Sequence, residues 1–272
     1  MTPWFWGILA ALSAGGFALA WWWCRRQVAQ LERLLASGDE RLERLQRAFE
    51  RFAPPDVVER LTDGPGDIAP QRRHVTMLFA DLRGFTALCD RLDPALTVTV
   101  LNDYFQAMNQ AVVRHHGHIN ELVGDGLLAL FGALEPNRWQ CRDAALAALD
   151  MRAALARYND TLRARGLPDL RFGIGIHSGE VVAGVIGTGG LSKFSVTGDP
   201  INVASRVEGL TRAFDVDLLI TEAVRESLDA QFVMRAMPPA RVKGKVEPIR
   251  TWWVEGLAVD RAAAPVNRAS AP

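Results

Sequence analysis

The sequence predicts an α+β fold in which a mixed β-sheet is covered by helices on one face. Long amphipathic segments alternate along the chain with short apolar runs joined by tight turns, an order typical of this class. Of the 272 residues, 49% are hydrophobic and 23% are charged, which is enough apolar surface to form a packed core and excludes a largely disordered chain. The length fits one enzyme-sized domain with accessory segments.

The charge balance and the cysteines exclude several functional classes. The 31 basic residues cancel the 31 acidic residues, so the chain has no net field to attract nucleic acid, and we expect no nucleic-acid partner. The three cysteines, Cys24, Cys89 and Cys141, match neither a disulfide framework nor a zinc ligand set. Most of the chain is therefore expected in a reducing compartment.

Residues 4–23 form an uncharged apolar run of the length that an α-helix needs to cross a bilayer. Tryptophans cluster at both ends, where indole rings favour the headgroup region. A cleaved signal peptide would need a basic region before the run and a small-residue cleavage site after it, and neither is present. The flanking Arg25 and Arg26 place the following residues in the cytoplasm. We therefore expect residues 1–24 to be a single-pass anchor in the cell inner membrane.

Residues 25–53 carry apolar side chains at alternating spacings of three and four, which predicts a short coiled coil between two copies of the chain. The seam consists of Val28, Leu31, Leu35, Leu42, Leu45, Phe49 and Phe52. The alternative is a single amphipathic helix lying on the membrane or on its own domain, because the segment is short and Gly38 weakens it. Residues 54–73 begin with two prolines, are rich in turn residues and are interpreted as a linker.

Residues 74–256 are predicted to form the globular domain, and residues 257–272 a disordered tail. Period-two and short apolar runs predict strands at 74–80, 117–123, 127–131, 171–177, 180–186 and 217–220, with further C-terminal strands ending at 254. Helical periodicity predicts helices at 94–115, 139–165 and 200–213. Two hairpins are expected, one through Gly124-Asp125-Gly126 and one through Ser178-Gly179.

Two acidic residues stand where strands end. Asp81 follows the first strand and Asp125 lies in the turn of the first hairpin. Carboxylates at strand ends can meet at one edge of a sheet, and hard oxygen ligands suit Mg²⁺ or Mn²⁺ together with substrate phosphates. Taken alone, each residue is more often a turn residue or a helix cap, so the spacing by itself leaves the metal site as the less favoured alternative.

Five motifs in a fixed order make the metal site the favoured interpretation of Asp81 and Asp125. They are FADLRGFT at 79–86, GHINELVGDGLLALFG at 117–132, GIGIHSGEVVAGVIG at 173–187, VTGDPINVASRVEGL at 196–210 and VKGK at 242–245. In order and spacing they resemble the class III purine nucleotidyl cyclases over about residues 52–254. The resemblance implies a ferredoxin-like core, a head-to-tail homodimer, and conversion of a nucleoside triphosphate to a 3′,5′-cyclic monophosphate and pyrophosphate.

The resemblance also implies roles for individual residues. Asp81 and Asp125 would bind two Mg²⁺ or Mn²⁺ ions per active site, and the backbone at Gly84, Phe85 and Thr86 would meet phosphate oxygens. From the other chain of the dimer, Asn202 would orient the ribose and Arg206 would neutralise charge on the α-phosphate. The sequence VKGK supplies the triphosphate lysine, which is Lys243 or, in the other register, Lys245.

The residues expected to select the base depart from the family pattern. Adenylate cyclases of this family commonly have a lysine and an aspartate or threonine where this chain has Glu121 and Ser195. Glutamate and serine match the donors and acceptor of guanine, whereas bacterial members that this chain resembles are mostly adenylate cyclases. We expect an adenylate cyclase that uses ATP, with a guanylate cyclase that uses GTP as the alternative. A membrane-tethered module that binds nucleotide without turnover is a further alternative.

Overall fold

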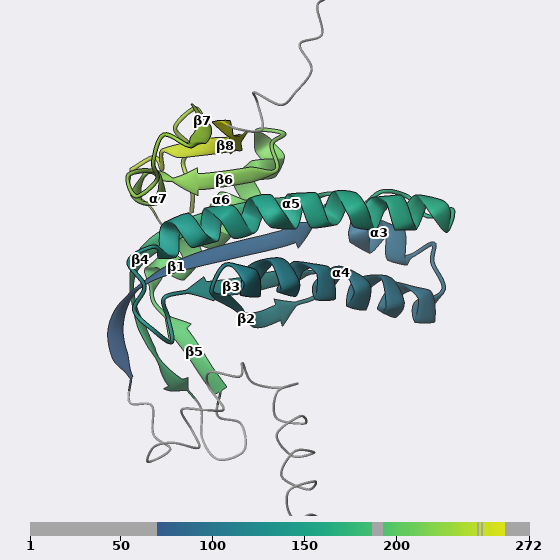
Figure 1. Cartoon of the computed structure of the whole chain (residues 1–272), viewed down its shortest axis with the longest axis horizontal. Coiled ribbons are helices and arrows are strands. Elements are labelled where there is room, and N and C mark those ends of the chain that lie inside the picture. Colours follow the sequence, from purple (N-terminus) through teal and green to yellow (C-terminus); the bar gives the residue numbers. More distant parts are fainter. Residues whose placement is uncertain (1–69, 187–192, 244, 246, 259–272) are drawn as a thin grey trace, which may run out of the picture. The chain divides into compact units, whose positions relative to one another are not determined.

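The computed structural model describes residues 70–186, 193–243, 245 and 247–258. The described strands form one eight-stranded mixed sheet of order β2-β3-β1-β4-β6-β8-β7, and β5 pairs with β4 off this path (Figure 1). The anchor, the coiled coil, most of the linker and nearly all of the tail predicted above lie outside the described residues. No helix in the described part of the chain is both long and apolar enough to span a membrane.

The bounds of β2, β3 and β6 match the prediction to within one residue, whereas β1 is longer at both ends, β4 replaces two predicted strands, and β5 was not predicted. The strands are β1 (Gln71–Leu82), β2 (Gly117–Val123), β3 (Gly126–Phe131), β4 (Phe172–Ile186), β5 (Lys193–Thr197), β6 (Leu218–Thr221), β7 (Phe232–Ala236) and β8 (Thr251–Leu257). Because β1 begins at Gln71, the linker predicted to reach residue 73 ends earlier than expected. The parallel pairing of β4 with β6 among antiparallel neighbours makes the sheet mixed, as predicted.

Three long helices and two short ones accompany the sheet in the described part of the chain. They are α3 (Phe85–Cys89), α4 (Pro94–Arg114), α5 (Gln140–Ala164), α6 (Asp199–Ala213) and α7 (Glu222–Arg225). The start of α4 is encoded locally, because the Asp93 carboxylate accepts hydrogen bonds from the Ala95 and Leu96 amides and Pro94 occupies the first turn.

The predicted hairpin through Ser178 and Gly179 is wrong, because β4 runs through both residues without a turn. It pairs with β1 in register, with Ser178 opposite Thr76 and Gly179 opposite Val75. The Ser178 hydroxyl is buried and lies 2.9 Å from the Thr76 hydroxyl, so the polar side chain is satisfied within the sheet. Packing leaves no room for a side chain at Gly179, since a Cβ there would lie 2.8 Å from Cγ of Pro200.

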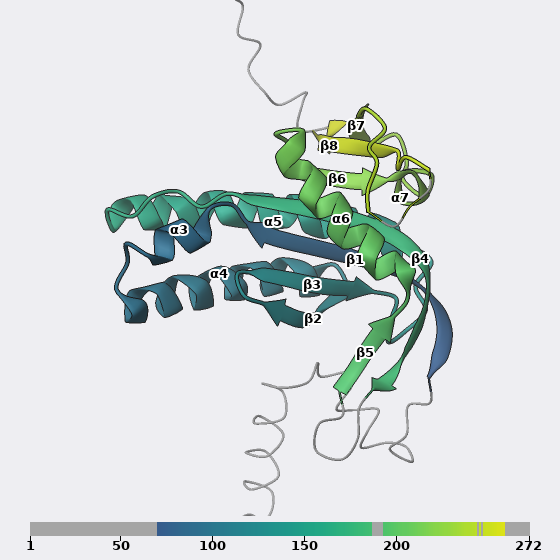
Figure 2. The same ribbon diagram turned by 180° about the vertical axis from the view of Figure 1, so that it is seen from behind.

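The expectation that helices cover only one face of the sheet is also wrong. Helices α4 and α5 lie on one face (Figure 1), and α6 crosses the opposite face (Figure 2). Strand β1 contributes to two apolar clusters, one around Leu78 and Tyr104 beneath α4 and α5, and one around Met77 and Ala204 beneath α6. Neighbouring residues of β1 alternate between the two clusters, as the period of a strand requires.

Glycines in β4 allow α6 to pack directly on the sheet. A Cβ at Gly175 would lie 2.1 Å from the backbone nitrogen of Glu208, and a Cβ at Gly173 would lie 2.1 Å from Oγ1 of Thr211. A larger residue at either position would push the helix away. The glycines therefore fix the height of α6 above the strand that carries them.

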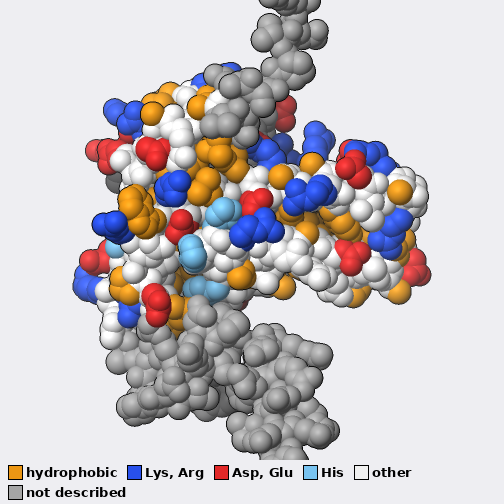
Figure 3. All heavy atoms as spheres, viewed as in Figure 1, with side chains coloured by type: hydrophobic (Ala, Val, Ile, Leu, Met, Phe, Trp, Pro, Cys, Tyr) orange, Lys and Arg blue, Asp and Glu red, His pale blue; other side chains and the backbone are white. Residues whose placement is uncertain are grey.

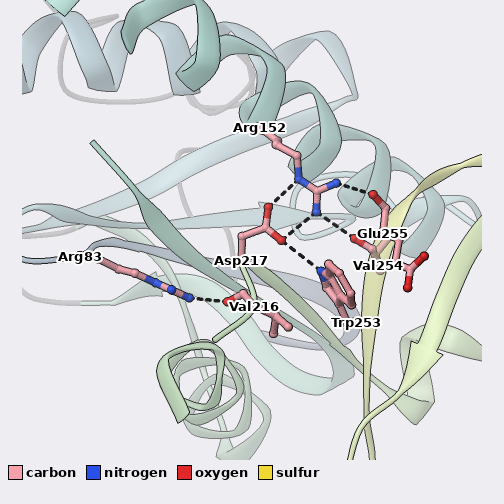
Figure 4. A network of polar contacts seen from close by, with 7 residues as sticks. All are labelled: Arg83, Arg152, Val216, Asp217, Trp253, Val254 and Glu255. Carbon is pink, nitrogen blue, oxygen red and sulfur yellow. Dashed lines mark hydrogen bonds and ion pairs between the residues drawn. The ribbon is translucent and has the colours of Figure 1, made fainter. Parts of the chain in front are cut away.

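A polar network centred on Arg152 joins α5 to β6 and β8 (Figure 4). The guanidinium makes two hydrogen bonds to the Asp217 carboxylate, at 2.6 and 3.0 Å, and donates to the carbonyls of Val254 and Glu255, both at 2.8 Å. The Asp217 carboxylate also accepts from Nε1 of Trp253 at 3.2 Å. One side chain thus satisfies the carboxylate just before β6 and two carbonyls of β8.

We expect Arg152→Met to lower the free energy of unfolding by about 2 kcal/mol, because it leaves a half-buried carboxylate and two carbonyls without their charged donor. The measurement is the denaturant midpoint of the full chain at neutral pH. The control is Arg163→Met on the same helix, where the arginine pairs with Asp160 and Asp169 at the surface and should contribute little. Equal shifts for the two variants would show that the network adds no stability.

Candidate active site

The fold places Asp81 and Asp125 at the same edge of the sheet. Asp81 is near the C-terminal end of β1, and Asp125 lies in the turn between β2 and β3. Strands β1 and β3 pair with Ala80 opposite Leu127, which brings the turn beside the end of β1. A Cβ on Gly126 would lie 3.0 Å from Oδ1 of Asp81, so the glycine leaves room for the carboxylate. Gly124 has a φ of 62°, the left-handed conformation that the tight turn needs.

The electrostatics at this edge favour a cation. Burial raises the pKa of the Asp81 carboxyl, and the charge of Asp125 raises it further, while Arg212 lowers it. Nη2 of Arg212 is 3.9 Å from Oδ2 of Asp81, and the two side chains are 69% and 40% exposed, so the arginine compensates only weakly. Two partly exposed carboxylates that repel each other are a donor set that fits a divalent ion completed by substrate oxygens.

Two further side chains near this edge were not identified from the sequence. Burial and the charge of Asp81 raise the pKa of Glu208 to about 7, with Arg212 and Arg83 opposing the shift. The Tyr104 hydroxyl is buried without a hydrogen-bond partner among the described residues, and burial followed by the charges of Asp81 and Asp125 raises its pKa. Glu208 lies within a recognised motif, but only tertiary packing brings it toward Asp81.

The backbone after Asp81 is less open than expected. Helix α3 begins at Phe85. Its N-cap residue is Gly84, which has a φ of 70°, and the helix has only five residues. The Arg83 amide donates to the Arg171 carbonyl at 2.7 Å, so this N–H is not available to a phosphate. Phe85 is buried in the core, while Gly84 and Thr86 are exposed beside the carboxylate edge.

Asn202 and Arg206 lie on α6, four residues apart and therefore on one face of the helix. Asn202 is exposed, whereas Nη1 of Arg206 is buried and has no hydrogen-bond partner among the described residues. Within the described part of the chain, no hydrogen bond or ion pair connects either residue to Asp81 or Asp125. One chain therefore presents two separate groups of the predicted site residues.

The remaining predicted residues lie on three different segments. Glu121 is exposed on β2, where the pairing with β3 shifts register between Ile119 and Glu121. Ser195 is half-buried on β5, opposite Gly184. Lys243 is exposed in the segment before β8.

Histidine side chains gather on the face shown in Figure 3, where basic and acidic side chains are interspersed. His116 and His118 line a hollow of about 600 Å³ together with Trp139. Nε2 of His115 instead lies 3.2 Å from the Asp150 carboxylate. Among the described residues, no group of three or more histidine, cysteine or acidic side chains is placed to hold a metal ion.

Comparisons with known proteins agree on one family. The profile of the adenylate and guanylate cyclase catalytic domain matches residues 68–256. The adenylate cyclase of Anabaena cylindrica is 34% identical over 243 residues, which are 84% of this chain and 47% of that protein. This chain spans less than half the length of the curated relatives that it matches first.

Solved structures support the same assignment. The guanylyl cyclase Cya2 is 34% identical with a TM-score of 0.64, covering 74% of this chain and 98% of that one. The adenylyl cyclase CyaB from P. aeruginosa is 26% identical with a TM-score of 0.65, covering 69% and 96%. The profile covers more than half of this chain and includes every residue of the candidate site. The chain therefore belongs to the adenylate and guanylate cyclase catalytic domain family.

Proposed function

We propose that this chain is a class III adenylate cyclase, which converts ATP to 3′,5′-cyclic AMP and pyrophosphate at sites formed between two copies. The observation that carries the proposal is the separation of the site residues into two groups. Asp81 and Asp125 lie at one edge of the sheet, while Asn202 and Arg206 share a face of α6, and among the described residues no hydrogen bond or ion pair joins the two groups. A second copy of the chain would bring the two groups together.

Each group has a distinct task in this reaction. Asp81 and Asp125 would hold two Mg²⁺ or Mn²⁺ ions, which when bound lower the pKa of the ribose 3′-hydroxyl and bind the triphosphate. Exposed backbone at Gly84 and Thr86 lies where phosphate oxygens would enter, beside the buried Phe85. Asn202 orients the ribose for in-line attack on the α-phosphate. The unpaired Nη1 of Arg206 is available to neutralise the charge that grows there.

Incubation of the full-length chain with ATP and with GTP in the presence of Mn²⁺ tests this proposal directly. We expect cyclic AMP as the main product. Cyclic GMP as the main product would identify a guanylate cyclase instead. Nucleotide binding without either product would support a signalling module without catalytic activity.

Base selection is proposed to depend on Glu121 and Ser195. Two of the relatives at 34% identity are named for different substrates, an adenylate cyclase and a guanylyl cyclase, so similarity does not decide the base. A glutamate can accept hydrogen bonds from guanine N1 and N2, whereas a lysine can donate to the N1 acceptor of adenine. Ser195 can donate or accept, and is compatible with either base.

We expect Glu121→Lys to raise the ratio of kcat/KM for ATP to kcat/KM for GTP by about tenfold or more, because it replaces an acceptor by a donor at the base. Initial rates with both nucleotides give this ratio. Glu226→Lys, which makes the same charge change at an exposed position outside the site, should leave the ratio unchanged. An unaltered ratio in Glu121→Lys would place base recognition elsewhere.

The segments outside the described residues complete the proposal. Residues 1–24 would anchor the chain in the inner membrane by a single span, and residues 25–53 would form a coiled coil that holds two catalytic domains at high local concentration. Residues 54–70 would link the coiled coil to a cytoplasmic catalytic domain that begins with β1 at Gln71 and is followed by a tail. Sedimentation of the full chain with alkali-washed membranes, and its loss on deletion of residues 1–24, would test the anchor.

A further inference from the structure

An ion pair connects α6 to the segment that carries the two candidate triphosphate lysines. Nζ of Lys245 contacts Oδ2 of Asp199, the first residue of α6. Asp199, Asn202 and Arg206 are spaced at three and four residues, so they lie on one face of the helix. The pair therefore attaches this segment to the same face that carries the proposed catalytic residues.

The lysine segment, between Ala240 and Ile249, is held at its two ends as well as by the ion pair. Ala240 and Ile249 exchange two backbone hydrogen bonds, of 3.1 and 2.8 Å, which close the ends of the segment on each other. Ile249 packs in an apolar cluster with Val203 and Val207 of α6. The Lys245 amide donates to the Val242 carbonyl at 3.2 Å, which places Lys243 within the turn that these two residues close.

The ion pair favours the ionised form of the Asp199 carboxyl. The hydrogen bond from Lys245 lowers the pKa of the Asp199 carboxyl, burial opposes this shift, and the charges of Lys245 and Arg206 add to the lowering. Burial and the charge of Lys245 lower the pKa of His177 to about 4, so its imidazole is neutral at pH 7 and does not compete for the carboxylate. Nδ1 of His177 is instead 2.8 Å from the Thr221 hydroxyl.

The two lysines differ in what they already bind. The Lys245 ammonium is engaged by Asp199, and would have to leave that carboxylate to reach a phosphate. Lys243 is exposed and makes no hydrogen bond or ion pair with any of the described side chains. The arrangement favours Lys243 as the residue that contacts the substrate.

We propose that Asp199 and Lys245 are a positioning pair, which holds Lys243 over the Asn202 and Arg206 face of α6 so that Lys243 binds the triphosphate. This inference deepens the proposed function and rests on it. Lys245 then acts through Lys243 and does not touch the substrate. Its effect is moderate, because the Lys245 and Asp199 side chains are 36% and 55% exposed and solvent screens the pair.

The test is a set of double-mutant cycles in the full-length chain with Mn²⁺. Two quantities are measured, the KM for ATP and the Kd for 3′-deoxy-ATP, an analogue that cannot cyclise. We expect Lys243→Met to raise both by about tenfold or more, because it removes a charge-assisted contact with phosphate. Lys245→Met and Asp199→Asn should each raise both by up to about fivefold, with kcat nearly unchanged.

The cycles distinguish positioning from direct binding. In the Lys243→Met background, Lys245→Met should have no further effect, and Asp199→Asn should add nothing to Lys245→Met. Lys245→Arg keeps the pair and should retain the wild-type constants. Asp169→Asn, which removes an exposed ion pair with Arg163 far along α5, is the matched control and should change neither constant.

Multiplicative effects of Lys243→Met and Lys245→Met would overturn the proposal, because they would show that each lysine binds phosphate independently. An unchanged Kd in Asp199→Asn would also overturn it. Failure of the cyclase proposal gives a different result, in which the wild-type chain forms no cyclic nucleotide but binds the analogue. The cycles in Kd would then still show whether Lys245 acts through Lys243.

Discussion

Replacement of Asp81 or Asp125 by alanine is expected to lower kcat for cyclic nucleotide formation by about a thousandfold or more, because each variant removes one of the two carboxylates proposed to hold the ions. The two residues meet at the edge formed by the end of β1 and the β2–β3 turn. Among the described residues, no third histidine, cysteine or acidic side chain completes a metal-binding group with these two carboxylates. The measurement is product formation by the full-length chain at saturating ATP and Mn²⁺.

A second measurement separates loss of the metal from loss of the fold. Mn²⁺ that binds only the folded state should raise the melting temperature of the wild-type chain, and this rise should be smaller or absent in both variants. Without metal, the variants should be at least as stable as wild type, because removal of one carboxylate relieves the repulsion that contributes to the raised pKa of Asp81. Asp90→Ala, at an exposed position after α3, is the control. Full Mn²⁺-dependent turnover in Asp81→Ala would refute the metal assignment.

Replacement of Arg206 by alanine is expected to lower kcat by about a hundredfold to a thousandfold, the usual effect of removing one preorganised donor to a developing charge. Nη1 of Arg206 is buried without a partner among the described residues, so its charge is not already compensated by a hydrogen bond. KM for ATP should change less than kcat, since the contact is proposed to strengthen only in the transition state.

Mixing the two kinds of inactive chain tests whether the site is shared. A dimer of one Asp81→Ala chain and one Arg206→Ala chain has both lesions in one site and none in the other. Co-expression should therefore restore about a quarter of the wild-type activity, because half of the dimers are mixed and each has one intact site. No recovery in purified mixed dimers would indicate that all the catalytic residues come from one chain.

Local chemistry explains why some elements could be predicted from the sequence. The predicted helix at 94–115 matches α4, because Asp93 and Pro94 define its start within the segment itself. Asp81 and Asp125 were expected at one sheet edge because strand ends and a hairpin turn already restrict where they can lie.

Other features depend on packing that the sequence does not display. Ser178 and Gly179 have the composition of a turn, but pairing with β1 and the approach of Pro200 make them part of a continuous strand. The side of the sheet that α6 occupies was likewise predicted wrongly, since helical periodicity does not specify a face. The contact between Asp199 and Lys245 joins residues 46 positions apart, beyond the reach of a local pattern.

The glycines of β4 have a mechanical consequence. Backbone of α6 rests against backbone of β4 at Gly175, with no side chain between them that could change rotamer and absorb a movement. Packed interiors have low compressibility, so a shift of the central strand is transmitted to the helix. A small bend of the sheet would therefore move Arg206 on α6. The turnover proposed to depend on Arg206 would then respond to strain in the sheet.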